Sequence, residues 1–389
     1  MPDLAITSAR PPATDLDRAA AQLSVRARKL APAIEADRRL PDELVAGLRS
    51  SGLLRAGAPA AVAAAEAPPA VTLRCAEEVA RGDASTGWCV SIAATSSLLG
   101  GWLPPEGLAE VFGESENVAA GVWAPRGKAR RVDGGYRVSG RWAFCSGLMH
   151  SDFFFGGCLL AQESDSASST PRVLGIPVGD LEILDTWHTS GLRGTGSRDA
   201  VADDVFVPEH RSLQLLEPAT SDAVLYRFPI FAFFALSITA AALGNARGAI
   251  EDLKALAVDK VGLGSSRTLA ERPATWSAVA QAEASLRAAR AFYYQAIDEA
   301  WAAAPSAEPV SVELRTGLRL AATHGARTAA DVARSMYDLG GGSAIYDDSP
   351  LQRRFRDAHA ATAHMQVNPA TWELTGRLLL DRPTETAML

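Results

Sequence analysis

Cysteine is scarce in this chain of 389 residues, and its copies stand apart. The four are Cys75, Cys89, Cys145 and Cys158. No two form a C-x-x-C pair, and none has a histidine at metal-ligand spacing, so no metal site is expected. Few and unclustered cysteines in a chain of this length are typical of a reduced, intracellular protein.

An excess of positive charge is also missing. Lys and Arg number 38 against 45 Asp and Glu, which gives a net charge of -7, so nucleic acid is not expected as a partner.

The N-terminus lacks the basic region followed by an apolar one that marks a secretion signal. The most apolar stretch, 228–243, is short for a membrane span and contains Ser237 and Thr239. We therefore expect a cytoplasmic protein without a membrane partner, in which this stretch is a buried helix.

Helical periodicity is present at both ends of the sequence. Apolar residues recur every three or four positions over 15–40, and shorter helical patterns cover 41–48, 71–80 and 86–99. From Tyr226 onward four long helices are predicted, over about 226–259, 274–303, 309–338 and 350–380. Their faces are rich in Ala, Gly and Ser, which suits close packing in a bundle.

The middle of the chain has a different pattern. From about 117 to 210, β-branched and aromatic runs alternate with Gly, Asp and Pro. Asp133-Gly134-Gly135 predicts a hairpin, the runs 153–160, 173–178 and 200–207 predict strands, and 163–170 predicts an exposed loop. The prediction is a mostly α protein with a central β-domain, divided into a helical domain 1–116, a β-domain 117–225 and a helical bundle 226–389.

Two segments in the first half carry candidate chemistry. Residues 82–88 read GDASTGW, where Asp83 or Ser85 could simply cap a helix. Residues 138–147 read VSGRWAFCSG, an aromatic strand that ends in Ser-Gly and could be an ordinary turn.

Two further segments are rich in glycine. Residues 191–197 read GLRGTGS; such a turn exposes backbone N–H groups, and Thr195 and Ser197 add hydroxyl donors for a phosphate. This is not the spaced-glycine dinucleotide fingerprint. Residues 339–343 read LGGGS and are followed by Pro350 and by RRFRD at 353–357.

Together, the order of these segments and of the predicted elements resembles the acyl-CoA dehydrogenase superfamily over most of the chain. The resemblance implies an N-terminal helical domain, a middle β-barrel and a C-terminal four-helix bundle. It also implies flavin contacts by Trp142, Phe144, Cys145, Ser146, Gly147, Arg193, Gly194, Thr195 and Ser197.

The resemblance further implies contacts that cross between subunits. Gly341 and Gly342 would approach the flavin of a neighbouring subunit, which implies a homotetramer. Arg267 would reach a dinucleotide's pyrophosphate, since an arginine fork suits phosphate; this favours FAD over FMN. Arg267 could equally be a solvated side chain.

One expected dehydrogenase residue is missing. Acyl-CoA dehydrogenases need a carboxylate that removes the proton alpha to a thioester, and many place it in the loop after the Arg-Asp pair. Here no glutamate follows Asp357 before Glu373, and His364 stands near the expected place. His364 with Ser146 resembles the oxygen-using branch instead, which includes hydroxyphenylacetate, steroid-phenol and indole hydroxylases, dibenzothiophene monooxygenase and nitrososynthases.

Membership of that branch implies a two-component system. The flavin would arrive reduced from a separate NAD(P)H-flavin reductase and react with O2 to a flavin hydroperoxide, which needs a dry site. Ser146 would hydrogen-bond the central ring nitrogen of the reduced flavin. His364 would shuttle a proton near neutral pH, or it could be a packing histidine; His359 and His150 compete for the role.

Aromatic side chains point to the substrate. Trp88, Trp123 and Trp102 fall in segments that wall the pocket in related enzymes. All three could equally be core residues, and for Trp102 core packing is the better interpretation. The function predicted is hydroxylation of an aromatic or heteroaromatic compound of phenol or indole type. The alternatives are N-oxygenation of an amino sugar, S-oxidation of a thiophene, a true acyl-CoA dehydrogenase and a scaffold without flavin.

Overall fold

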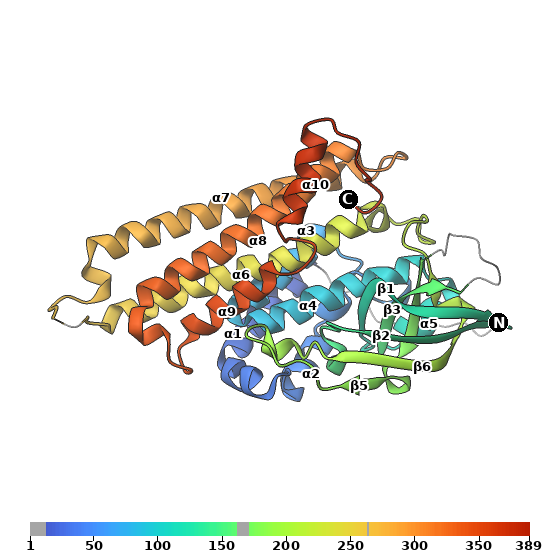
Figure 1. The fold of residues 1–389 in the computed structure, drawn as a ribbon, viewed down its shortest axis with the longest axis horizontal. Coiled ribbons are helices and arrows are strands. Elements are labelled where there is room, and N and C mark those ends of the chain that lie inside the picture. The colour runs from blue at the N-terminus through green and yellow to red at the C-terminus, as the bar shows by residue number, and fades with distance from the viewer. Residues whose placement is uncertain (1–12, 162–170, 263) are drawn as a thin grey trace.

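A computed structural model describes residues 13–161, 171–262 and 264–389 of the chain. Helices occupy both ends of the sequence, and the strands of the middle segment form one sheet at one end of the molecule (Figure 1). The predicted fold class, mostly α with a central β part, is confirmed. The predicted loop 163–170 lies outside the described residues.

The N-terminal helices surround one that is fully buried. The helices are α1 (Ala13–Asp37), α2 (Asp42–Ser50), α3 (Pro69–Gly82), α4 (Ala84–Ser97) and α5 (Pro105–Phe112). Every residue of α4 is buried, because α4 packs against α3, α6 and β1. Asp83 caps α4, since its carboxylate accepts from the backbone N–H of Thr86 at 2.8 Å. The capping alternative for this segment is therefore confirmed.

The sheet is mixed and has seven strands. They are β1 (Ala119–Val132), β2 (Gly135–Trp142), β3 (Phe153–Leu160), β4 (Pro171–Pro177), β5 (Glu182–Leu184), β6 (Asp199–Pro208) and β7 (Ser212–Leu213). Their order is β5-β6-β2-β1-β3-β4-β7, with β1 and β3 parallel and the other neighbours antiparallel. The predicted hairpin is confirmed: Val132 pairs with Gly135, and Gly134 turns the chain with φ +74°.

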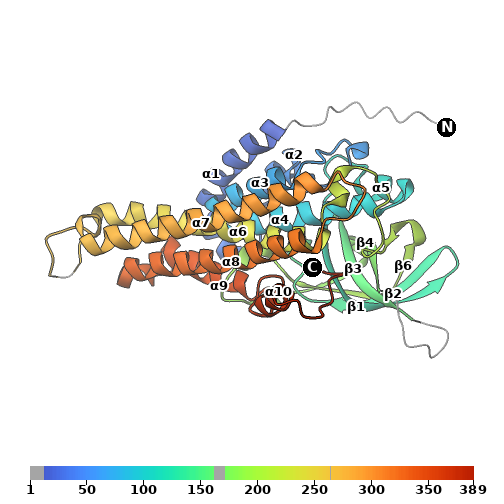
Figure 2. The ribbon, with the colours of Figure 1, turned by 90° about the horizontal axis from the view of Figure 1, so that it is seen from above.

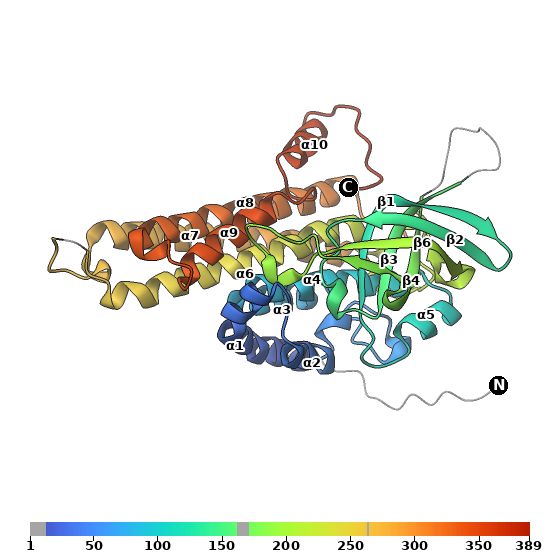
Figure 3. The ribbon, with the colours of Figure 1, turned by 60° about the horizontal axis from the view of Figure 1, so that its bottom comes forward.

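The C-terminal helices are α6 (Ile230–Asp259), α7 (Pro273–Ala303), α8 (Val312–Gly340), α9 (Pro350–Thr362) and α10 (Ala370–Leu379). Figures 2 and 3 show α6, α7 and α8 running side by side, while α10 projects from the side of this bundle in Figure 3. Helix α6 is long and apolar enough to cross a membrane by length and composition, but 83% of its most apolar window is buried inside the protein. It is the core helix that the sequence predicts.

One predicted helix is wrong in its extent. The segment 350–380 forms two helices rather than one, and residues 363–369 connect them. Pro369 explains why no helix runs through the second half of this connection: its ring disfavours helical geometry at Asn368, and it has no N–H to donate. The break leaves His364 outside any helix.

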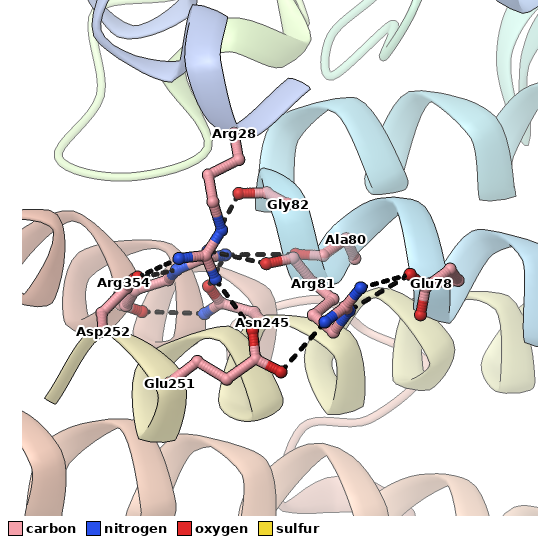
Figure 4. A network of polar contacts seen from close by, with 9 residues as sticks. All are labelled: Arg28, Glu78, Ala80, Arg81, Gly82, Asn245, Glu251, Asp252 and Arg354. Carbon is pink, nitrogen blue, oxygen red and sulfur yellow. Dashed lines mark hydrogen bonds and ion pairs between the residues drawn. The ribbon is translucent and has the colours of Figure 1, made fainter. Parts of the chain in front are cut away.

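A buried arginine fixes α9 against the rest of the protein (Figure 4). The side chain of Arg354 is 3% exposed. Its N–H groups donate at 2.7–3.3 Å to the side chains of Asp252 and Asn245 and to the backbone carbonyls of Ala80, Arg81 and Gly82. These carbonyls end α3, where a helix leaves its last oxygens without intrahelical partners. One guanidinium thus joins α9 to α3 and α6.

The same network extends to α1. Arg28 of α1 donates to the other carboxylate oxygen of Asp252 at 2.6 Å and to Glu251 at 3.0 Å. Gly248 of α6 leaves the space that Arg354 occupies, because a Cβ there would lie 2.4 Å from its guanidinium carbon. Four helices therefore meet at Asp252 and Arg354.

Removing this guanidinium should destabilise the whole chain. We expect Arg354→Met to lower the free energy of unfolding by about 3 kcal/mol or more. The variant leaves the buried carbonyls at the end of α3 and one oxygen of the Asp252 carboxylate without a hydrogen-bond donor. Urea denaturation followed by circular dichroism measures this loss. Arg334→Met on α8 is the control, since Arg334 is 54% exposed and its ion pairs are long; it should cost about 1 kcal/mol or less. Equal losses in the two variants would contradict this account of the network.

Candidate functional site

Ser146 lies in the turn after β2 and is 8% exposed. Gly147 follows it with φ +75°, a conformation that favours glycine and that turns the chain into the next short helix. The indole Nε1 of Trp88 donates to the Ser146 hydroxyl at 3.1 Å, and the hydroxyl of Ser197 lies 2.7 Å from it. The N-terminal helix α4 and two loops of the β region therefore meet at one hydroxyl group.

His364 lies against the same tryptophan. Its ring centroid is 5.8 Å from that of Trp88 and 5.3 Å from that of Phe234 on α6, both edge to face. The ring centroid of Trp123 on β1 is 5.2 Å from that of Phe234. We call Trp88, Phe234 and Trp123 together the aromatic wall. The structure thus brings Ser146 and His364 to the same indole, and Trp123 reaches this group through Phe234. Phe234 is a member of this wall that the sequence analysis missed, since it lies in an apolar run that predicts only a buried helix.

The imidazole of His364 is neutral at physiological pH. Burial among these rings lowers its pKa to about 4. The backbone N–H of Gln366 donates to Nδ1 at 3.3 Å, so Nδ1 is the acceptor and the ring proton is on Nε2. The ring can therefore offer a fixed N–H donor. This arrangement does not suit the expected proton shuttle near neutral pH.

The two competing histidines have other surroundings. His150 is buried, burial lowers its pKa to about 4, and its Nε2 accepts from the backbone N–H of Leu40 at 3.2 Å. His359 is exposed on α9 and bonds the carbonyl of Phe355. Among the ring contacts of the described residues, neither His150 nor His359 lies against Trp88.

Phe144 is held in an unusual conformation beside this site. Its φ is +64°, in the left-handed region that bulky side chains avoid, and its ring is 71% exposed. The ring packs edge to face on Trp187 at 6.0 Å. Strained and exposed aromatic residues of this kind occur at ligand sites.

These residues fit a flat, largely apolar cofactor such as the isoalloxazine of a flavin. Phe144 offers an exposed ring, and the hydroxyl of Ser146 lies two residues further along the same turn. The indole nitrogen of Trp123 is buried without a hydrogen-bond partner in the structure, so the wall also holds an unused donor.

Two of the expected flavin contacts face into the protein. Trp142 is fully buried in the core of the sheet, where its Nε1 donates to the carbonyl of Gly157 at 2.9 Å. Cys145 is also fully buried, with its thiol on the carbonyl of Trp142. Their side chains cannot reach a cofactor unless this core opens, so neither is part of the site that we propose.

The glycine-rich turn 191–197 is packed rather than open. Thr195 and Ser197 are each 1% exposed, and their hydroxyls bond each other at 2.6 Å. A Cβ on Gly194 would lie 2.1 Å from a side-chain carbon of Ile34 on α1, and Arg193 lies beside Glu35. The prediction of free phosphate donors here is wrong for these two hydroxyls, because the turn is buried against α1 and holds Ser146 instead.

The remaining expected contacts lie at the other end of the bundle. Arg267 is exposed in the connection between α6 and α7, which lies away from the sheet (Figure 1). Lys260 joins this end to the glycine junction through the hydroxyl of Ser343 at 2.7 Å, and Gly341 and Gly342 are exposed there. Within one chain these residues are not brought to Ser146.

Known proteins resemble this chain along most of its length. Residues 236–369 match the family described as acyl-CoA dehydrogenase, C-terminal domain. Indole-3-acetate monooxygenase of Pseudomonas putida is 33% identical, over 92% of this chain and 92% of its own. The FADH(2)-dependent resorcinol hydroxylase, oxygenase component, of Rhizobium sp. is 29% identical, over 90% of each chain.

A solved structure agrees with this relationship. The HsaA monooxygenase from M. tuberculosis superposes with a TM-score of 0.90 at 28% identity, covering 97% of this chain and all of that one. The relatives are monooxygenases and hydroxylases that share the acyl-CoA dehydrogenase fold, and they cover all three parts of the chain. The chain belongs to the flavin-dependent monooxygenase branch of the acyl-CoA dehydrogenase superfamily and is an oxidoreductase.

Proposed function

We propose that this chain is the oxygenase component of a two-component system that hydroxylates an aromatic ring of phenol or indole type. The observation that carries the proposal is the meeting of Ser146 and His364 on Trp88 inside an aromatic wall. Indole-3-acetate and resorcinol, named for two relatives, are rings of these types. Flat aromatic substrates suit walls of Trp and Phe.

The cofactor would be free reduced flavin delivered by a separate NAD(P)H-flavin reductase. When bound, reduced flavin supplies the two electrons that activate O2. We favour FAD over FMN, because one relative is named for FADH2 and because the fork of Arg267 suits a pyrophosphate. Phe144, Ser146 and Gly147 would hold the ring system.

The protein's own groups would bind, orient and exclude water. Burial of Ser146 and the aromatic wall keep the site dry, which strengthens its hydrogen bonds. His364 would act as a neutral donor through Nε2–H rather than as a proton shuttle. Trp88, Trp123 and Phe234 would hold the substrate ring.

Among the residues that the structure describes, the contacts of His364 in the aromatic wall are with aromatic rings and include no carboxylate that could serve a dehydrogenase. Glu373, the first glutamate after Asp357 in the sequence, is exposed on α10 and lies outside the aromatic wall. The proposed oxygenase chemistry requires no such base.

A second copy of the chain would complete the site. Arg267, Gly341 and Gly342 can contact flavin only if another subunit presents them, as the expected homotetramer would. We propose this assembly and a cytoplasmic location, where a soluble reductase can supply the flavin.

Turnover with a reductase tests the proposal directly. The chain, FAD, NADH and a flavin reductase should convert indole- or phenol-type compounds to hydroxylated products, detected by mass spectrometry with 18O2. Amino sugars and dibenzothiophene test the two other oxygenations, and an acyl-CoA with an electron acceptor and no O2 tests the dehydrogenase. Conversion of only the acyl-CoA would reject the monooxygenase.

Loss of the Ser146 hydroxyl should uncouple oxygen use from hydroxylation. We expect Ser146→Ala to lower the ratio of product to O2 consumed by roughly tenfold, the effect of one hydrogen bond in a dry site, with H2O2 rising to match. Ser50→Ala is the control, because the Ser50 hydroxyl bonds the carbonyl of Gly47 within α2. If Ser146→Ala couples as well as the unmodified chain, Ser146 has no such role.

The pH dependence of turnover should show no titration of His364 in the neutral range. Because burial lowers its pKa to about 4, the neutral ring persists above about pH 5 and is lost only as the pH falls toward 4. We expect kcat/KM to lack a histidine step between pH 5.5 and 8. His364→Asn, which keeps an N–H donor, should retain more activity than His364→Ala, with a difference of roughly tenfold. If kcat/KM shows a step at about pH 6.5 and His364→Ala abolishes it, then His364 acts as a proton shuttle after all.

A further inference from the structure

A row of hydroxyl groups runs inward from Ser146 and has two unlike ends. The indole N–H of Trp88 begins it and can only donate. The hydroxyls of Ser146, Ser197 and Thr195 follow at 2.7 Å and 2.6 Å. The carbonyl oxygen of Leu192 ends it, 2.7 Å from the Thr195 hydroxyl, and can only accept.

The unlike ends fix the direction of every hydrogen bond between them. Each hydroxyl has one proton to donate. Thr195 uses its proton on the carbonyl of Leu192, so Ser197 must donate to Thr195. Ser197 then has no second proton, so Ser146 must donate to Ser197. Ser146 therefore donates its only proton to Ser197. To a bound molecule it can act only as a hydrogen-bond acceptor.

The accepting end of the row is held firmly in place. Leu192 has φ +52°, and its carbonyl also accepts from Trp187 Nε1 at 3.0 Å and from the backbone N–H of Thr195 at 3.2 Å. Its own N–H donates at 2.7 Å to the buried carboxylate of Asp357 on α9. The carbonyl thus keeps its position whether or not Thr195 donates to it.

The backbone before Leu192 is fixed as well. A Cβ on Gly191 would lie 2.3 Å from the carbonyl oxygen of Arg356 in α9, so the two backbones are in direct contact. The turn 191–197 is thereby clamped between α1 and α9.

The two redox states of a flavin differ at N5, the atom to which a hydrogen-bond acceptor in this position would bind. The central nitrogen N5 of oxidised flavin carries no proton and accepts hydrogen bonds, whereas N5 of reduced flavin carries a proton and donates. An acceptor-only hydroxyl matches the reduced state and leaves the oxidised state with two facing acceptors, which is unfavourable.

We propose that Ser197 and Thr195 are positioning residues that hold Ser146 as an acceptor and so make the site select reduced over oxidised flavin. The inference rests on the proposed function, in which Ser146 faces the flavin ring. It assigns to the buried turn 191–197 a part in cofactor discrimination, and it gives the oxygenase a means to release flavin once it is oxidised.

Breaking the row should weaken this selection without removing Ser146. In Thr195→Val, Ser197 loses its acceptor and can donate to Ser146, which frees the Ser146 proton for oxidised flavin. In Ser197→Ala, the Ser146 proton is freed directly. Thr195→Ser keeps the hydroxyl and is the matched control.

The measurement is the ratio of dissociation constants for oxidised FAD and for dithionite-reduced FAD, the latter under anaerobic conditions. We expect the ratio to fall by roughly fivefold to tenfold in Thr195→Val and in Ser197→Ala, the effect of one hydrogen bond, and to stay unchanged in Thr195→Ser. Tenfold corresponds to a shift of about 30 mV in the midpoint potential of bound flavin, a two-electron couple. A variant that merely loosens the turn would weaken both redox states alike.

Two results would overturn the inference in different ways. If the unmodified chain binds both states and neither Thr195→Val nor Ser197→Ala changes the ratio, the row does not set the selection, although the proposed function stands. If the unmodified chain binds flavin in neither state, the proposed function fails as well. Circular dichroism and thermal melts of each variant establish that it is folded before binding is measured.

Discussion

The buried ion pair between Arg354 and Asp252 is the contact on which the arrangement of the molecule depends. A guanidinium without water must find a partner for every N–H, and here it finds them on α3 and α6. Such a group tolerates little displacement, because moving it by one helical turn would leave several buried donors unpaired. The position of α9 is therefore fixed relative to helices that come from the other half of the chain.

The position of α9 in turn sets both sides of the candidate site. One turn after Arg354, Asp357 holds the N–H of Leu192 and with it the turn that supports Ser146. Beyond the end of α9, the connection 363–369 carries His364 to Trp88. One short helix thus places the hydroxyl and the imidazole, although each belongs to a different part of the fold. Burial also raises the pKa of Asp357 to about 7, with the charge of Asp83 adding to the effect.

The electrostatic character of the site follows from its enclosure. Because the histidine ring lies among aromatic groups, its charged form is disfavoured, and its chemistry becomes that of a directed donor. Because the hydroxyls lie between a donor-only and an acceptor-only end, their protons have one arrangement. The same burial that removes water therefore decides which groups donate and which accept, and it does so before any cofactor binds.

The sequence by itself determined the order of helices, strands and helices, since periodicity and turn residues such as Asp133-Gly134-Gly135 are local signals. It also predicted Ser146, His364, Trp88 and Trp123 as one group, through resemblance to a family. It could not show that Trp142 faces the core, because the face of a strand that is buried depends on what packs against the sheet. Nor could it show that Thr195 and Ser197 bond Ser146, or that Phe234 completes the wall. Those outcomes, and the neutral state of His364, depend on contacts between residues distant in the chain, which only the tertiary structure decided.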